Sequence, residues 1–105
     1  MSATEYLLVF QFEASSKEDF DELIVLEQTI AGCLARESVV DGHDFGCGEF
    51  NIFIFTFSLE ADFHAGLRFL QDKMLWRQVK AGYRALTEDE YTVLYPEDLN
   101  EFKVA

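Results

Sequence analysis

The feature that most constrains the fold is a segment, Glu49 to Phe57, that is apolar on both faces of the strand it predicts. Alternate side chains of a strand point to opposite faces of its sheet. The apolar side chains form two such sets, with Ile52 and Ile54 on one face and Phe53, Phe55 and Phe57 on the other. A strand of this kind is typical of a sheet that is covered on both faces. The fold must therefore supply a cover for each face.

The other apolar segments predict a β-α-β-β-α-β order with one further strand near the C-terminus. Short apolar runs predict strands at residues 6–12, 38–44, 49–57, 78–86 and 91–95, and helical apolar spacing predicts helices at residues 17–36 and 60–77. This order is typical of a ferredoxin-like α+β domain, in which right-handed crossovers place both helices on one face of an antiparallel sheet. A chain of 105 residues has room for one such domain, residues 1–105.

Two signals describe the first helix in more detail. Ser15 and Glu18 match a capping box, in which the serine caps the helix and the glutamate reaches back to it. Cys33 falls in the apolar pattern of this helix, where a free cysteine behaves as a small hydrophobic side chain. Cys33 and Cys47 are the only cysteines, too few for a disulfide framework.

The chain is strongly acidic, with 20 acidic and 8 basic residues and a formal net charge of −12. A field of this sign repels phosphate backbones, so we expect no nucleic-acid binding. One group of basic residues is close in sequence, and we interpret it as a solvated helix end and strand: Arg68, Lys73, Arg77, Lys80 and Arg84. The N-terminus has no signal core, and no apolar run reaches the roughly 18 residues of a membrane span. We therefore expect a cytoplasmic protein without membrane contact.

Candidate functional side chains concentrate between residues 41 and 49. Five of them carry oxygen, nitrogen or sulfur atoms of the kind that bind divalent metals: Asp41, His43, Asp44, Cys47 and Glu49. Their spacing matches neither an EF-hand loop nor the paired ligands of zinc sites, so we expect no metal and no other cofactor. The acidic neighbours of Cys47 disfavour its thiolate form, which argues against a cysteine nucleophile.

The glycines of the same segment predict a tight hairpin. We place the turn at residues 45–48, where Gly46 and Gly48 would supply positive φ angles, and we assign Gly42 to a bulge in the second strand. A turn at Asp41-Gly42 is the alternative, but it leaves the long third strand with too short a partner.

The sequence Val40-Asp-Gly-His-Asp-Phe-Gly-Cys-Gly-Glu-Phe-Asn-Ile-Phe-Ile54 resembles a hairpin that recurs in small, mostly uncharacterised bacterial proteins of similar length. Their pattern is V-D-G-H-[DE]-x-G-x-G-E-x-N-I-[FY]-[IV], placed between two helices. Some of these proteins resemble immunity partners of secreted bacterial toxins. The resemblance singles out a set of positions and implies no catalytic role for any of them: Asp41, Gly42, His43, Gly46, Gly48, Glu49 and Asn51.

The apolar pattern also predicts an interaction surface. Two helices cover only one sheet face, and the C-terminal strand and tail are too short to hide the whole of the other. We expect a homodimer packed through this second face, or a protein partner in its place. The interface is expected to use one alternating set, either Phe53, Phe55 and Phe57 or Ile52 and Ile54.

The leading interpretation is a non-enzymatic protein-binding domain, an acidic immunity or inhibitor type that binds a basic partner. One alternative is a small-molecule-binding protein or enzyme with a site around Asp41, His43 and Glu49. Another is a structural subunit that functions only as a homo-oligomer. Strand alternation places Asp41 and His43 on one face and Asp44 on the other. The candidate binding residues are Asp41, His43, Asp44, Glu49 and Asn51.

Overall fold

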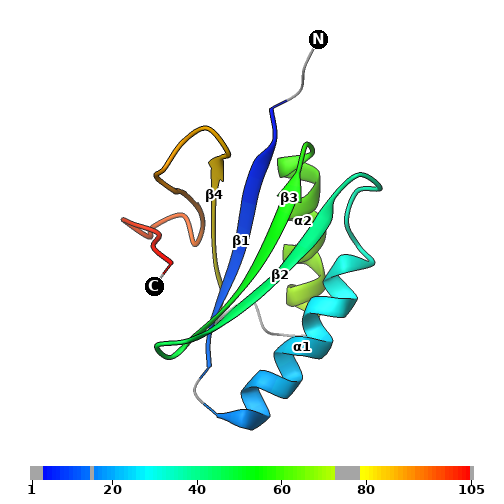
Figure 1. The fold of residues 1–105 in the computed structure, drawn as a ribbon, viewed down its shortest axis with the longest axis vertical. Helices are drawn as coiled ribbons and strands as arrows, with labels where there is room; N and C mark the ends of the chain where they lie inside the picture. Colours follow the sequence, from blue (N-terminus) through cyan, green and yellow to red (C-terminus); the bar gives the residue numbers. More distant parts are fainter. Residues whose placement is uncertain (1–3, 15, 73–78, 105) are drawn as a thin grey trace.

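The computed structural model describes residues 4–14, 16–72 and 79–104. Its elements are β1 (Tyr6–Glu13), α1 (Lys17–Ala31), β2 (Val39–Gly46), β3 (Glu49–Thr56), α2 (Leu59–Asp72), β4 (Val79–Ala85) and β5 (Thr92–Tyr95). The strands form one sheet in the order β2-β3-β1-β4-β5, and all neighbouring strands are antiparallel. Figure 1 shows this sheet in front of α2, with the C-terminal segment on the side of β4. The predicted α+β fold with five antiparallel strands and two helices is confirmed.

Both helices pack on the same face of the sheet. The core beneath them combines the even-numbered side chains of β1 and β3 with a stripe of α1: Leu8, Phe10, Phe12, Phe50, Ile52, Ile54, Leu23, Leu26 and Ile30. The stacked rings of Phe10 and Phe63, 6.4 Å apart, join β1 to α2. Each large apolar side chain contributes about 1.5–3 kcal/mol to folding when it leaves water. This face therefore holds most of the fold together.

The opposite face, called the open face below, is partly covered by the chain itself. Its apolar side chains include Leu7 and Val9 of β1 and Phe53 and Phe55 of β3. The segment after β5 turns back over this face and packs Phe102, which is 4% exposed, against the two β1 side chains. The tail thus covers part of the open face, as expected for a sheet that is buried on both faces.

The first helix begins at Lys17, as predicted, but its N-cap is one residue later than predicted. Ser16 is the N-cap, and it forms a reciprocal capping box with Asp19. Ser15, the predicted cap, lies outside the described residues. Both serines precede an acidic residue by three positions, so the sequence pattern fits either one equally well.

The first helix also ends earlier than predicted. It stops at Ala31 with Gly32 as C-cap, not at residue 36. As a result Cys33 is exposed, and its assignment to the buried stripe is wrong. The second helix is described as far as Asp72; residues 73–77 of the predicted helix, which include Lys73 and Arg77, lie outside the described residues.

The β2–β3 hairpin turns at Cys47 and Gly48. Their φ angles are 54° and 77°, and two successive positive values are characteristic of a type I′ turn. The prediction of positive φ is correct for Gly48 and wrong for Gly46, which stays in β2 opposite Glu49. The predicted bulge is present, because the β2–β3 register shifts just before Gly42, whose φ is 131°.

Candidate functional site

The sheet divides the predicted hairpin residues between its two faces. Asp44 lies opposite Asn51 on the open face. Glu49 points the same way as Asn51, since residues two apart on a strand share a face. His43 lies on the helix-covered face. Asp41 occupies the bulge, between Val40 and Gly42. The structure thus brings Asp44, Glu49 and Asn51 together and separates them from His43.

His43 attaches β2 to α1. Its Nδ1 lies 3.1 Å from the carboxylate oxygen Oε2 of Glu27, whose side chain is only 13% exposed. The imidazole ring stacks on Phe50 at 4.9 Å with an interplanar angle of 13°, and the edge contact with Phe20 is at 5.6 Å. These contacts fix the ring in a structural position between helix and sheet.

A polar row crosses the open face over four neighbouring strands. Register places Asp44 of β2 beside Asn51 of β3, Asn51 beside Gln11 of β1, and Gln11 beside Lys80 of β4. Gln11 is 5% exposed and Asn51 is 2% exposed. Two buried amides in the middle of a sheet face need hydrogen-bond partners, because an unpaired buried polar group is costly.

The Gln11 amide connects the sheet to the C-terminal tail. Its Nε2 donates to Asn51 Oδ1 at 3.0 Å and to the backbone carbonyl of Lys103 at 2.8 Å. Glu49 Oε1 lies 3.4 Å from the same nitrogen. Since an amide nitrogen carries two protons, the two shorter contacts use both of them.

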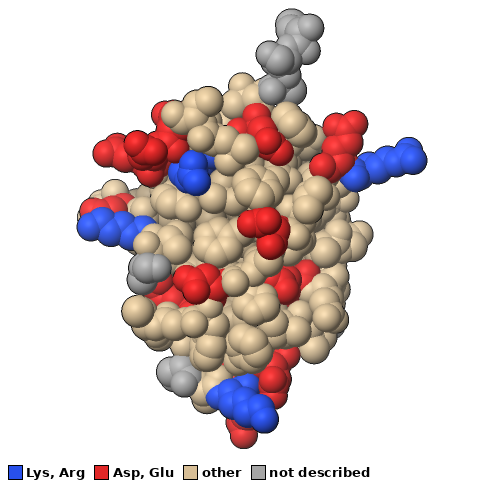
Figure 2. All heavy atoms as spheres, in the orientation of Figure 1, with Lys and Arg blue, Asp and Glu red and all other residues tan. Residues whose placement is uncertain are grey.

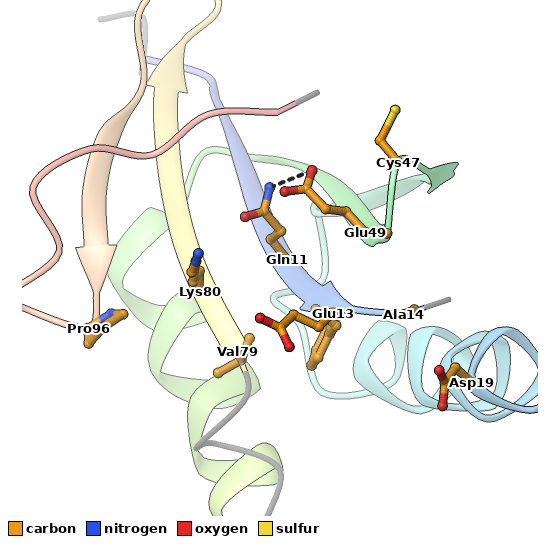
Figure 3. A pocket seen from close by; sticks show the side chains of 11 residues that line it. Gln11, Glu13, Ala14, Asp19, Cys47, Glu49, Val79, Lys80 and Pro96 are labelled. Atoms are coloured by element: carbon orange, nitrogen blue, oxygen red, sulfur yellow. Dashed lines mark hydrogen bonds between the residues drawn. The ribbon is translucent and has the colours of Figure 1, made fainter. Parts of the chain in front are cut away.

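A broad hollow of about 730 Å³ opens at the polar end of this face. Its walls include Gln11, Glu13, Glu49, Lys80 and Pro96. Figure 3 shows Gln11 and Glu49 turned toward each other across the hollow, with Lys80 beside them on β4. Carboxylate, amide and ammonium groups line it, so its chemistry is that of a hydrated polar surface.

The described residues do not assemble a recognisable catalytic group at this hollow. Cys47 is exposed on the hairpin turn, and the nearest histidine in sequence, His43, lies on the opposite face of the sheet. A nucleophilic cysteine usually requires such a base within hydrogen-bond distance. Within the described part of the chain, no three His, Cys, Asp or Glu side chains are placed to hold a metal ion.

The other end of the open face is apolar and partly exposed. Val39 lies opposite Phe55 in the β2–β3 register, and Phe57 is the first residue after β3. Val39 is 58% exposed and Phe57 is 45% exposed, while Phe55 is half-buried. We call these three residues the exposed strip. Figure 2, in the orientation of Figure 1, shows carboxylates scattered over a largely uncharged surface with basic groups nearer its edges.

One buried charged residue was not anticipated. Asp62, in the first turn of α2, is 0% exposed. Its carboxylate accepts hydrogen bonds from the backbone N–H of Ala35 and from the Ser38 hydroxyl. An acidic residue at a helix N-terminus is common in any sequence, so no signal marks this one as buried.

Comparison with protein-family models, with curated proteins and with solved structures finds no match to this chain. Among the described residues, no helix is both long enough and apolar enough to cross a membrane.

Proposed function

We propose that the chain is a non-enzymatic protein-binding domain of the acidic immunity or inhibitor type, which binds a basic protein through the open face of its sheet. The observation that carries this proposal is the exposed strip of Val39, Phe55 and Phe57. Large apolar side chains that are exposed next to one another usually mark an interaction site.

Charge favours a basic partner over a second copy of the chain. Each copy carries a formal net charge of −12, so two copies repel each other as they approach. A basic protein is attracted by the same field, and this attraction raises its association rate. Contacts with the apolar strip then slow its dissociation. A homodimer through the strip is the competing outcome.

Two further parts of the proposal concern fold group and location. A ferredoxin-like classification is supported by the positions of β1 and β3 in the centre of the sheet, with β2 and β4 outside them and β5 as an addition. A cytoplasmic location is supported by Cys33 and Cys47, since two exposed free thiols suit a reducing compartment.

The test compares charge substitutions inside and outside the strip. The wild type, a Val39→Glu/Phe57→Glu variant and a Val25→Glu variant serve as baits in a lysate of the source organism. Val25 is the matched control, because it is an apolar residue 62% exposed on α1. We expect a basic protein that the wild type and the Val25 variant retain and the strip variant loses, and that binds again as a purified component. Retention by all three baits, or a stable wild-type dimer in sedimentation, contradicts the proposal.

A second candidate function is small-molecule binding in the polar hollow. It is favoured by the buried Gln11 amide, which lies within 3.4 Å of Glu49 at the wall of the hollow. Glu49→Gln and Lys80→Met are the substitutions that would remove such binding while leaving the exposed strip intact.

A further inference from the structure

The C-terminal segment lies across the open face without joining the sheet, and the part of the face that it covers, around Leu7, Val9 and Gly82, is called the groove below. Residues 96–98 form a turn, and residues 99–104 are neither helix nor strand. Figure 3 shows this segment passing over β4 toward β1. The buried anchor is Phe102, which packs against Leu7 and Val9 and makes an edge contact with the Tyr91 ring at 5.4 Å.

The sheet has a socket for this ring at Gly82. A Cβ atom built on Gly82 would come within 2.5 Å of two carbons of the Phe102 ring, closer than real carbon atoms approach. A glycine inside a strand often marks a place where another chain segment approaches the backbone closely. Gly82 lies opposite Val9, so the socket is central on the open face.

The groove also forms a hydrogen bond with the backbone of the segment, next to the ring. Gln11 Nε2 donates to the carbonyl of Lys103, the residue that follows the anchor. The charged side chains on either side of Phe102 point away from the sheet: Lys103 Nζ and Glu101 Oε1 pair with each other at 2.8 Å and their side chains are 80% and 60% exposed. What the groove recognises is therefore an aromatic ring followed by a backbone carbonyl.

The segment is not packed closely along its whole length. A hollow of about 500 Å³ lies between the loop before β5 and the tail, with walls that include Glu90, Tyr91, Phe102 and Val104. The tail also carries three carboxylates, Glu97, Asp98 and Glu101, against the single ammonium of Lys103, within a chain of net charge −12. The C-terminal segment is thus anchored by one ring, and its carboxylates are repelled by the negative charge of the rest of the chain.

We infer that this groove is a peptide-binding site for an extended basic segment with one aromatic side chain, and that the chain's own C-terminal segment fills the site in cis. The inference rests on the proposed function, and it identifies the element by which a basic partner is recognised. The partner's ring replaces Phe102 in the Gly82 socket, and its basic flanks gain the attraction that the acidic tail lacks. The exposed strip then lies beside the displaced tail as additional contact surface.

The experiment uses the full-length chain and a labelled synthetic peptide with the sequence of residues 96–105 in which Glu97, Asp98 and Glu101 are replaced by lysine. Fluorescence anisotropy measures its binding to the wild type and to a full-length Phe102→Ala variant, in which the socket is empty. We expect binding to the variant to be about tenfold tighter than to the wild type, and to fall about tenfold or more when the phenylalanine of the peptide is replaced by alanine. The peptide of native, acidic sequence should bind more weakly at low salt, and this difference should shrink at 0.5 M salt, where the Debye length falls to about 4 Å.

A second measurement covers the case in which Phe102→Ala does not fold. The same lysine-substituted peptide is titrated into the wild-type chain and followed by NMR. Shifts at Leu7, Val9 and Gly82 support the inference, and shifts confined to residues outside the groove contradict it. Equal binding of the phenylalanine and alanine peptides also overturns it. The Val39→Glu/Phe57→Glu variant should still bind the peptide, so the groove and the exposed strip are tested separately.

Discussion

The Asp62 carboxylate accepts a hydrogen bond from the backbone N–H of Ala35 at 2.7 Å, across 27 positions of sequence. Its second oxygen accepts from the hydroxyl of Ser38, and that hydroxyl lies 3.2 Å from the hydroxyl of Thr56. One carboxylate therefore joins the α1–β2 connection to the start of α2 and the end of β3. This connection sets where β2 enters the sheet, and so where the hairpin residues are placed.

We expect Asp62→Ala to destabilise the fold by about 2–4 kcal/mol, because it leaves a buried N–H and a buried hydroxyl without their acceptor. Urea denaturation measures the free energy of unfolding. Glu60→Ala is the matched control, since Glu60 is an exposed acid in the same first turn of α2. A loss as small as that of the control would show that the connection does not depend on Asp62.

The hairpin turn allows a sharper test of the backbone. Gly48→Ala should cost about 1 kcal/mol or more, because alanine tolerates a positive φ poorly. Gly46→Ala is the control, since Gly46 has no positive φ and no atom lies within 4 Å of an added Cβ. Cys47→Asn should be neutral or stabilising, because asparagine is favoured at the first position of a type I′ turn. Equal losses at positions 46 and 48 would contradict the turn geometry.

Two substitutions of His43 test whether this candidate site residue has a structural role. His43→Phe keeps a ring against Phe50 and removes only the interaction with Glu27, so its cost should stay within about 0–1 kcal/mol. His43→Ala removes the ring as well and should cost about 1–2 kcal/mol more, from the loss of aromatic contact and buried area. Thermal or urea unfolding ranks the two variants. If His43→Phe leaves stability intact but abolishes binding of an isolated partner, His43 contacts that partner directly.

The sequence predicts the order of the elements because apolar periodicity acts locally. It also predicts that β3 is buried on both faces, which the structure bears out for Ile52 and Ile54 under the helices and in part for Phe53 and Phe55 under the tail. What it misses depends on contacts between distant residues. Phe102 stands in a polar stretch without periodicity, and only the socket at Gly82 explains its burial.

The division of the candidate site has a similar cause. Simple alternation places Asp41 and His43 on the same face. The bulge before Gly42 adds one residue to β2, so the alternation of faces is interrupted at Asp41. A bulge can be suspected from a glycine, but its position relative to the partner strand is fixed by the pairing itself. The sequence therefore identified the residues of the hairpin without showing which of them lie together.

The exposed strip gives the prediction on which the proposed function depends most directly. Phe57 is 45% exposed, so Phe57→Glu should change the free energy of unfolding by no more than about 0.5 kcal/mol, as is usual for surface substitutions. Ile54 is 0% exposed beneath the helices, so Ile54→Glu should unfold the domain, because it buries an unpaired charge.

The stability cost of Phe55→Glu should lie between those of Phe57→Glu and Ile54→Glu. Phe55 is half-buried against the cluster that contains Leu7, Val9 and Phe102, so a glutamate at this position loses part of its hydration and part of the apolar contact. We expect Phe55→Glu to cost about 1–3 kcal/mol and to leave a folded monomer, with circular dichroism and sedimentation velocity as the measurements. If Phe57→Glu destabilises the chain as much as Ile54→Glu does, the open face is core along its whole length. In that case no apolar surface remains for a partner, and the strip loses its role.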